Sequence, residues 1–257
     1  MPKKILFVHQ ERKFKYGAHY INDLIIEKLR KKGYTVDTVY PKESMNIFSG
    51  SLCGIGNILF FYSLINKKKD ISKYQLVQGT TYTILPFLGS GVPVVSHFGS
   101  TTYGFLKKVP PQKRLEEENK HLPGIFKDIK NELLINNNSS SIKSLHDINK
   151  MEIEVAKKST AIIATSKNVE KELVKNGVPP HKIHLIHNAI EDYWFDTKHT
   201  QKAKRLANLV YLGRIGDDAF TIKLKGVNRL VYILKNTPDM DKVVIGMCSK
   251  IREYTRF

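Results

Sequence analysis

The stretch KILFVHQERKFKYGAHYINDLIIEKLRKKGYTVDTVY, residues 4–40, decides the fold. Residues 4–10 are rich in β-branched and aromatic side chains, which is typical of a buried strand, and residues 18–32 repeat apolar positions at helical spacing before Gly33. Residues 34–40 form a second predicted strand. A strand, a glycine-containing loop, a helix and a strand in this order predict a βαβ unit, whose two strands run parallel in one sheet.

The same alternation of strands and helices continues along the chain. It predicts helices over 51–66, 82–89 and 144–158, and strands over 74–79, 92–99, 160–166 and 183–189. A further helix is predicted to begin at Ser166, whose hydroxyl suits an N-cap. Over 101–150 the alternation is lost, because three prolines and the run NNNSSS interrupt helical pieces of mixed charge. This segment is predicted to be an irregular excursion from the domain.

A second strand and helix follow a charged stretch at 191–208. The segment LVYLGRIGDDAFTIKLKGVNRLVYIL, residues 209–234, predicts a strand, a loop carrying cations and an amphipathic helix, and residues 242–247 add a strand. We therefore predict an α/β fold with a nearly complete Rossmann-like domain over 1–195 and a linker with an incomplete second domain over 196–257. Since a complete domain usually needs about 100 to 150 residues, we expect a fragment, a truncated chain or a split gene product.

The composition narrows the class of protein. The 257 residues include 42 Lys and Arg against 24 Asp and Glu, a formal charge of +18, which attracts nucleic acids, anionic lipid surfaces and phosphorylated substrates. The alternative is a set of solvated lysines without a partner. Cys53 and Cys248 have no metal-like spacing, which argues against a structural zinc site and fits a reducing, cytoplasmic location. The longest apolar stretch, 51–65, is shorter than the roughly 20 residues that span a bilayer.

Five segments in order resemble the GT-B retaining glycosyltransferases of the family 4 group, and together they cover nearly the whole chain. They are KYGAHYINDLIIEKLRKKGYTVD (15–37), VPVVSHFG (92–99), AKKSTAIIATSKNVEKELVKNGVPPHKIHLIHNAI (156–190), YLGRI (211–215) and LKGVNRLVYIL (224–234). The resemblance implies two facing Rossmann-like domains, an acceptor-binding one and a nucleotide-sugar-binding one, with the reaction between them. It also implies a nucleotide sugar such as a UDP- or GDP-sugar as substrate, and neither a cofactor nor a metal.

The resemblance assigns the donor diphosphate to Arg214 and Lys225. Breaking a sugar–diphosphate bond builds negative charge on the departing phosphate, and positive groups placed there lower the barrier. The guanidinium of Arg214 suits two phosphate oxygens, whereas Lys225 supplies a compact charge at the start of a predicted helix. Asp217 and Asp218 lie between them, and the alternative is a strand-to-helix turn with surface charges.

Three further residues match family positions, each with a simpler alternative. His97 ends a predicted strand where the resembling proteins have a histidine that touches the donor sugar, although here Phe98 separates it from Gly99. Gly17 would let the backbone approach a ligand closely, or is simply a turn glycine. Asn188 stands where the family has a Pro-Asn-Gly segment, and as a turn residue it needs no function.

One family element, a pair of glutamates with seven residues between them that contacts the donor, is missing from the sequence up to Phe257. We therefore expect the 257-residue chain to transfer sugar poorly.

Other readings remain open. A GT-B-like binding module without activity would have the same fold. A basic nucleic-acid-binding protein would have the same charge, but no helix-turn-helix, RNA-recognition signature or zinc-finger spacing supports it. The apolar stretch 51–65 precedes Lys67, Lys68 and Lys69, a pattern that predicts peripheral binding to an anionic membrane surface or, alternatively, a helix packed on the sheet with solvated lysines. The acceptor, whether glycan, lipid or protein, cannot be read from the sequence.

Overall fold

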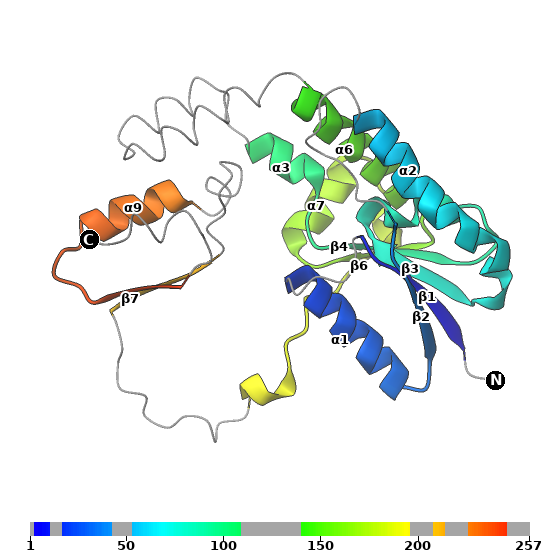
Figure 1. Ribbon diagram of the computed structural model, residues 1–257, viewed down its shortest axis with the longest axis horizontal. Helices are drawn as coiled ribbons and strands as arrows, with labels where there is room; N and C mark the ends of the chain where they lie inside the picture. Colours follow the sequence, from blue (N-terminus) through cyan, green and yellow to red (C-terminus); the bar gives the residue numbers. More distant parts are fainter. Residues whose placement is uncertain are drawn as a thin grey trace. The chain divides into compact units, whose positions relative to one another are not determined.

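A computed structural model describes residues 3–10, 17–42, 53–108, 140–195, 208–213 and 226–245. The chain divides into two compact units (Figure 1). The first contains the described residues up to Ile190, and the second contains those from Glu191 onward. The predicted domain boundary between 195 and 196 stays a prediction, and residues 109–139 of the predicted excursion lie outside the described residues.

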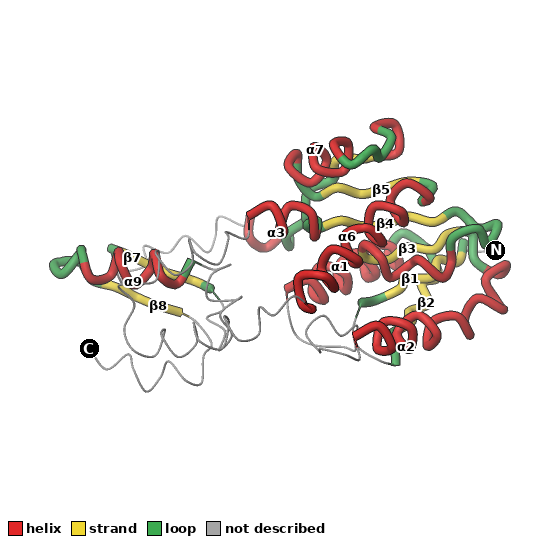
Figure 2. The backbone as a smooth tube through the Cα atoms, turned by 90° about the horizontal axis from the view of Figure 1, so that it is seen from above, coloured by secondary structure: helices red, strands yellow, loops and turns green. Residues whose placement is uncertain are grey.

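The first unit is built on a six-stranded, all-parallel sheet with the order β2-β1-β3-β4-β5-β6. Neighbouring strands of this sheet lie side by side in Figure 2. The strands are β1 (Lys4–Val8), β2 (Thr35–Val39), β3 (Leu76–Thr80), β4 (Val94–Phe98), β5 (Ala161–Ala164) and β6 (Ile183–Leu185). The predicted parallel sheet is confirmed. β2 lies on one side of β1, and β3 lies on the other. The direction in which successive strands are added to the sheet therefore reverses between β1 and β3.

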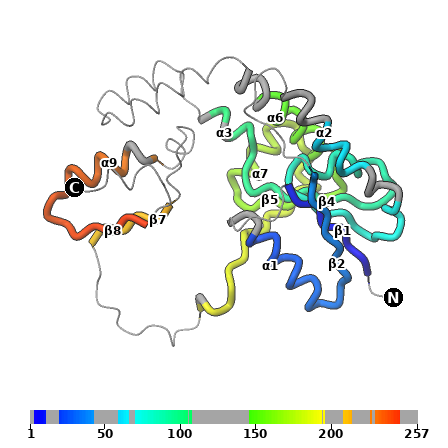
Figure 3. Tube along the Cα trace, viewed as in Figure 1, coloured from blue at the N-terminus to red at the C-terminus, as the bar shows by residue number. Residues whose placement is uncertain are grey.

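Helical segments connect successive strands, as Figure 3 shows along the chain. They are α1 (Gly17–Lys31), α2 (Cys53–Ile65), η1 (Asn66–Lys73), η2 (Thr81–Phe87), α3 (Thr102–Lys108), α6 (Ser140–Lys158), α7 (Lys167–Lys175) and η3 (Pro180–Lys182). The predicted helix over 82–89 is a 3₁₀ helix, η2, and contains Pro86. The predicted N-cap at Ser166 is confirmed, because its hydroxyl accepts a hydrogen bond from the Val169 N–H at 3.3 Å.

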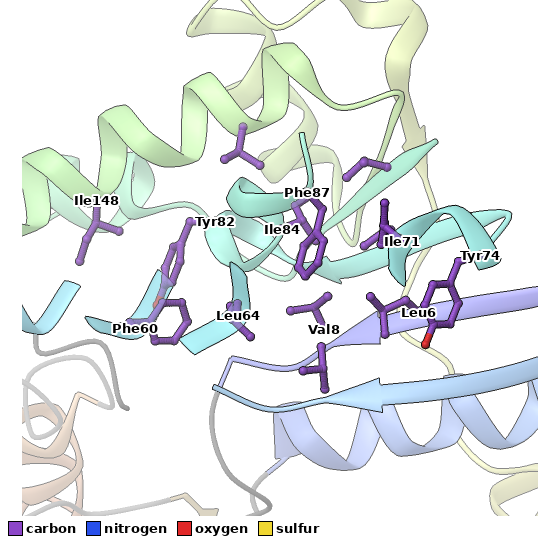
Figure 4. Close-up of a cluster of buried hydrophobic side chains, with 14 residues drawn as sticks. Leu6, Val8, Phe60, Leu64, Ile71, Tyr74, Tyr82, Ile84, Phe87 and Ile148 are labelled. Atoms are coloured by element: carbon purple, nitrogen blue, oxygen red, sulfur yellow. The ribbon is translucent and has the colours of Figure 1, made fainter. Parts of the chain in front are cut away.

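Successive residues of β1 face opposite sides of the sheet, and both sides are covered. Leu6 and Val8 belong to a buried cluster with side chains from α2, η1, η2 and α6, whereas Ile5 and Phe7 pack with Ile26 of α1. Figure 4 shows the larger cluster. Its labelled members are Leu6, Val8, Phe60, Leu64, Ile71, Tyr74, Tyr82, Ile84, Phe87 and Ile148. Strands buried on both faces explain why β1 reads as a continuous apolar run.

The second unit contains η4 (Asp192–Phe195) and a smaller βαβ segment. Its strands β7 (Leu209–Leu212) and β8 (Lys242–Ile245) pair in parallel, and α9 (Val227–Lys235) lies between them in the chain. Gly226 is the N-cap of α9 with a left-handed backbone, φ 65° and ψ 34°. The strand and helix predicted from 209–234, and the strand predicted from 242–247, are thus confirmed.

Gly79 of β3 marks a close approach between the sheet and η2. A Cβ atom placed on Gly79 would lie 2.5 Å from Cγ2 of Ile84, 2.7 Å from Oγ1 of Thr83 and 3.0 Å from the carbonyl oxygen of Val8. The side chains of Ile84 and Thr83 are fully buried and have little room to move. Position 79 therefore excludes any side chain unless the core shifts.

We expect Gly79→Ala to lower the free energy of unfolding by about 1 to 3 kcal/mol, because overpacking forces neighbouring groups from their positions. Gly99→Ala is the matched control, since no described atom lies within 4 Å of a Cβ placed there, and it should change stability by less than about 0.5 kcal/mol. Urea denaturation of the two variants measures the difference. Equal stability of the two variants would contradict this account of the packing.

Candidate functional site

The candidate site lies at the carboxyl edge of the six-stranded sheet, around β1, β3 and β4. In open parallel sheets, ligands bind outside the carboxyl ends of the strands, where the strand order reverses. This reversal falls between β1 and β3. Gln10, which follows β1, connects the two sides of this reversal: its Nε2 donates a hydrogen bond to the hydroxyl oxygen of Tyr82, which follows β3, at 2.7 Å. The topology therefore places the residues after β1, β3 and β4 at the edge where a ligand is expected.

His97 near the end of β4 is buried at this edge, with 7% of its surface exposed. Within the described part of the chain, its Nδ1 atom is buried and has no hydrogen-bond partner. Burial lowers the pKa of His97 below its ordinary value of 6.5, so the imidazole is neutral at pH 7. A neutral imidazole offers one donor and one acceptor nitrogen, which suits a ligand hydroxyl group.

Thr80 is the neighbour of His97 on β3, in register with it across the parallel pair. Registered residues of adjacent strands point to the same face of a sheet, with the strands about 4.8 Å apart. The Oγ1 atom of Thr80 is also buried and has no hydrogen-bond partner among the described residues. Buried polar groups in native proteins are rarely unpaired, so these two atoms on adjacent strands call for a partner such as an ordered water or a ligand group.

The backbone beside this pair is strained. Thr81 has a φ of 43°, in the left-handed region that a β-branched residue rarely adopts. The hydroxyl of Ser96 on β4 donates a hydrogen bond to the carbonyl oxygen of Thr81 at 2.8 Å and so helps to hold this turn. Backbone strain of this kind costs about 1 to 3 kcal/mol and is concentrated at functional sites.

The connection after His97 is fixed by Thr165, which follows β5. The Thr165 N–H donates to the carbonyl oxygen of Phe98 and its hydroxyl to that of Gly99, both at 3.2 Å. The Nδ1 atom of His187 lies 2.9 Å from the carbonyl oxygen of Thr165. Thr165 thus links the ends of β4 and β5 to the segment that follows β6. Neighbouring Asn188 is exposed.

The candidates predicted from the sequence are only partly described. His97 lies near the carboxyl end of β4, Asn188 follows β6 near His187, and Gly17 begins α1. Arg214 and Lys225 lie outside the described residues, between the end of β7 and Gly226. The predicted diphosphate site therefore stays a prediction.

Glu152 on α6 is a residue that sequence reasoning missed. It is 5% exposed, and its Oε2 atom accepts a hydrogen bond from the Thr102 N–H at 2.8 Å. The sequence does carry a signal, because Glu152 lies four residues after Ile148 and three before Val155, on the buried stripe of the helix. A carboxylate in an apolar stripe indicates a specific partner.

Among the described residues, no group of three or more His, Cys, Asp or Glu side chains could hold a metal ion. Nor does any helix among the described residues have the length and apolar character needed to cross a membrane.

No family model matches the chain, and no curated protein matches it by sequence. Its structure resembles sucrose-phosphate synthase from Thermosynechococcus elongatus, with a TM-score of 0.55 and 12% identity over 98% of this chain and 73% of that one. The chain has a GT-B fold. Lower similarities include HepE from Anabaena in complex with UDP-glucose (TM-score 0.45, 12% identity, 98% and 71% of the two chains). The lipopolysaccharide outer core galactosyltransferase WaaB matches with a TM-score of 0.49 and 9% identity over 98% and 71%.

Glu152 should make stability depend on pH. Burial raises the pKa of Glu152 from 4.5 to about 7, although the hydrogen bond from Thr102 opposes the shift. Between these two values the folded state keeps a proton that the unfolded state releases, so the free energy of unfolding falls as the pH rises. The shift corresponds to about 3 kcal/mol at most.

Glu152→Gln cannot titrate and should lose this part of the pH dependence when urea denaturation is compared at pH 5 and pH 8. Glu154→Gln is the control, because Glu154 is exposed on the same helix and pairs with Lys158 at 3.6 Å. If Glu152→Gln and the unaltered protein lose the same stability between the two pH values, the account of Glu152 is wrong.

Proposed function

We propose that the chain is a retaining glycosyltransferase, related to the family 4 group, that takes its sugar from a nucleotide-sugar donor without a metal. The observation that carries the proposal is the buried His97 at the carboxyl edge of a GT-B fold, whose Nδ1 has no hydrogen-bond partner among the described residues. Its burial lowers the pKa of the ring and so favours the neutral form. The named activity of the sucrose-phosphate synthase that shares this fold supports the same class of reaction.

In this proposal, His97 contacts a hydroxyl group of the donor sugar. An uncharged ring suits a hydroxyl better than a phosphate, because it provides hydrogen bonds without the charge that a phosphate requires. The unpaired hydroxyl of Thr80 on the adjacent strand adds a second group of the same chemistry. The sugar would then satisfy polar atoms whose burial otherwise costs stability.

The proposal assigns the diphosphate to Arg214 and Lys225, which neutralise the charge that develops on the leaving group. Charge-assisted hydrogen bonds from these two cations take the place of a metal ion. Gly17 would allow close approach of the backbone to the ligand, and Asn188 would hydrogen-bond to it from the segment after β6. These roles rest on the family resemblance of the sequence.

Arg214→Gln should weaken binding of UDP or GDP by about 1.5 to 3 kcal/mol, roughly a tenfold or larger rise in the dissociation constant. Lys225→Gln should act in the same direction. Isothermal titration calorimetry with the 257-residue chain measures both. Lys235→Gln on α9 is the control, since Lys235 is an exposed cation of the same unit.

Unchanged nucleotide affinity in Arg214→Gln and Lys225→Gln would contradict the diphosphate assignment. Nucleotide-sugar binding without any transfer to acceptor mixtures, even when a glutamate-bearing segment of a relative is supplied, would favour a non-catalytic binding module. RNA binding without saturable binding of UDP or GDP would favour the nucleic-acid-binding alternative.

A second proposal concerns an anionic membrane surface. On α2, Leu59, Tyr62 and Ile65 are 47%, 62% and 46% exposed, and their spacing places them on one side of the helix, whereas Phe60 and Leu64 are buried on the other. Lysines 67 to 69 follow the end of the helix after one residue, Asn66, and the chain carries a formal charge of +18. Apolar side chains beside a basic segment are the combination that peripheral membrane binding uses. We therefore propose that α2 holds the protein at the inner face of a membrane.

Replacing Leu59, Tyr62 and Ile65 together by Gln should reduce flotation with phosphatidylglycerol-containing liposomes about tenfold or more, because apolar burial in the interface is lost. Binding of the unaltered protein should fall as salt rises. Tyr20→Gln, an exposed aromatic of α1, is the control. Failure of the unaltered protein to float at low salt, or full binding by the triple variant, would refute the membrane proposal.

A further inference from the structure

The start of α3 is held by two carboxylates that come from different helices. Glu152 of α6 accepts the hydrogen bond from the Thr102 N–H, and Glu172 of α7 accepts one from the hydroxyl of Thr101. The same Thr101 hydroxyl oxygen accepts a hydrogen bond from the Gly104 N–H at 2.9 Å. Thr101 therefore already caps the helix in the ordinary way, and the two glutamates are added to a capped terminus.

Both glutamates are packed closely against the segment that they hold. Glu152 is buried, and the carboxyl carbon of Glu172 would lie only 2.7 Å from a Cβ atom placed on Gly104. The side chain of Glu172 thus occupies the space that any larger residue at 104 would need. Placing a buried carboxylate here is costly, which indicates a requirement for position beyond helix stability.

The held segment begins directly after His97. Four anchors follow it, namely the carbonyl oxygens of Phe98 and Gly99 bonded by Thr165, the hydroxyl of Thr101 and the N–H of Thr102. The anchoring groups come from the end of β5 and from α6 and α7. Because β4 is fixed in the sheet on one side and this connection is fixed on the other, the backbone that carries the imidazole is held on both sides.

We propose that Glu152 and Glu172 are positioning residues for His97: by fixing residues 101 and 102, beyond the two residues that Thr165 holds, they keep its imidazole at the carboxyl edge of the sheet. This inference rests on the proposed function, in which His97 contacts the donor sugar. The glutamates themselves do not touch the ligand in this arrangement. Their effect passes through the backbone between His97 and Thr102.

The direct test uses the nitrogen resonances of ¹⁵N-histidine-labelled protein, with the His97 signals assigned from the His97→Gln variant. In Glu152→Leu and Glu172→Leu, the His97 ring signals should shift, and the pKa of His97 should rise toward 6.5 because the site opens to water. Glu152→Gln and Glu172→Gln keep an acceptor oxygen and should remain close to the unaltered protein. Glu154→Gln, exposed on α6, should change nothing.

Milder variants decide the question if the leucine variants do not fold. Thr101→Val removes the partner of Glu172, and with it the acceptor of the Gly104 N–H, with little change of shape. Glu152→Asp retains the carboxyl group but withdraws the acceptor by one methylene group. Each should shift the His97 signals in the same direction. The proposal would be overturned if the His97 signals and the pKa of His97 were unchanged in folded variants of Glu152 and of the Thr101–Glu172 pair.

A binding measurement separates this inference from the proposed function. The affinity for a UDP- or GDP-sugar, divided by the affinity for the free nucleoside diphosphate, isolates the contribution of the sugar contact. This ratio should fall about tenfold in the variants that displace His97, as expected for one lost hydrogen bond. The affinity for the free nucleotide should stay unchanged. If the unaltered protein binds no nucleotide sugar, the proposed function fails, whereas the histidine resonances still decide whether the glutamates position His97.

Discussion

The parallel pairing of β1 with β2 on one side and β3 on the other is the constraint on which the first unit depends. Parallel strands end at the same edge of the sheet, so residues far apart in the sequence gather there without any further device. The same pairing buries β1 on both faces, which requires helices on both sides of the sheet. The core and the candidate site are therefore two results of one arrangement.

The carboxyl edge combines several features that each lower stability. Thr81 has a strained backbone, the Nδ1 of His97 is buried without a partner among the described residues, and Glu152 carries a carboxyl group into an apolar region. Each such feature costs on the order of 1 to 3 kcal/mol, and the buried clusters on both faces of the sheet offset them. A ligand that supplies the missing hydrogen bonds would recover part of this cost, which favours binding at this edge over binding elsewhere.

Periodicity in the sequence was sufficient to predict the strands and most helices, because alternating or continuous apolar runs report burial directly. It was also sufficient to place His97 at a strand end. The role of Glu152 could not be predicted in the same way, because its partner is a backbone N–H fifty residues earlier that only the folded chain brings near. Thr80 was missed for a similar reason, since its meaning depends on the register between β3 and β4. Arg214 and Lys225 depend on the family resemblance alone.

The lack of space for a side chain at Gly79 has an evolutionary consequence. A single substitution there meets Ile84, Thr83 and the backbone of Val8 at once, so selection should remove it before any benefit elsewhere can appear. A lineage could leave glycine only after residues 83 and 84 had become smaller, which makes the three positions epistatic. Sequence divergence in related proteins should therefore proceed freely around this strand and remain coupled at these positions.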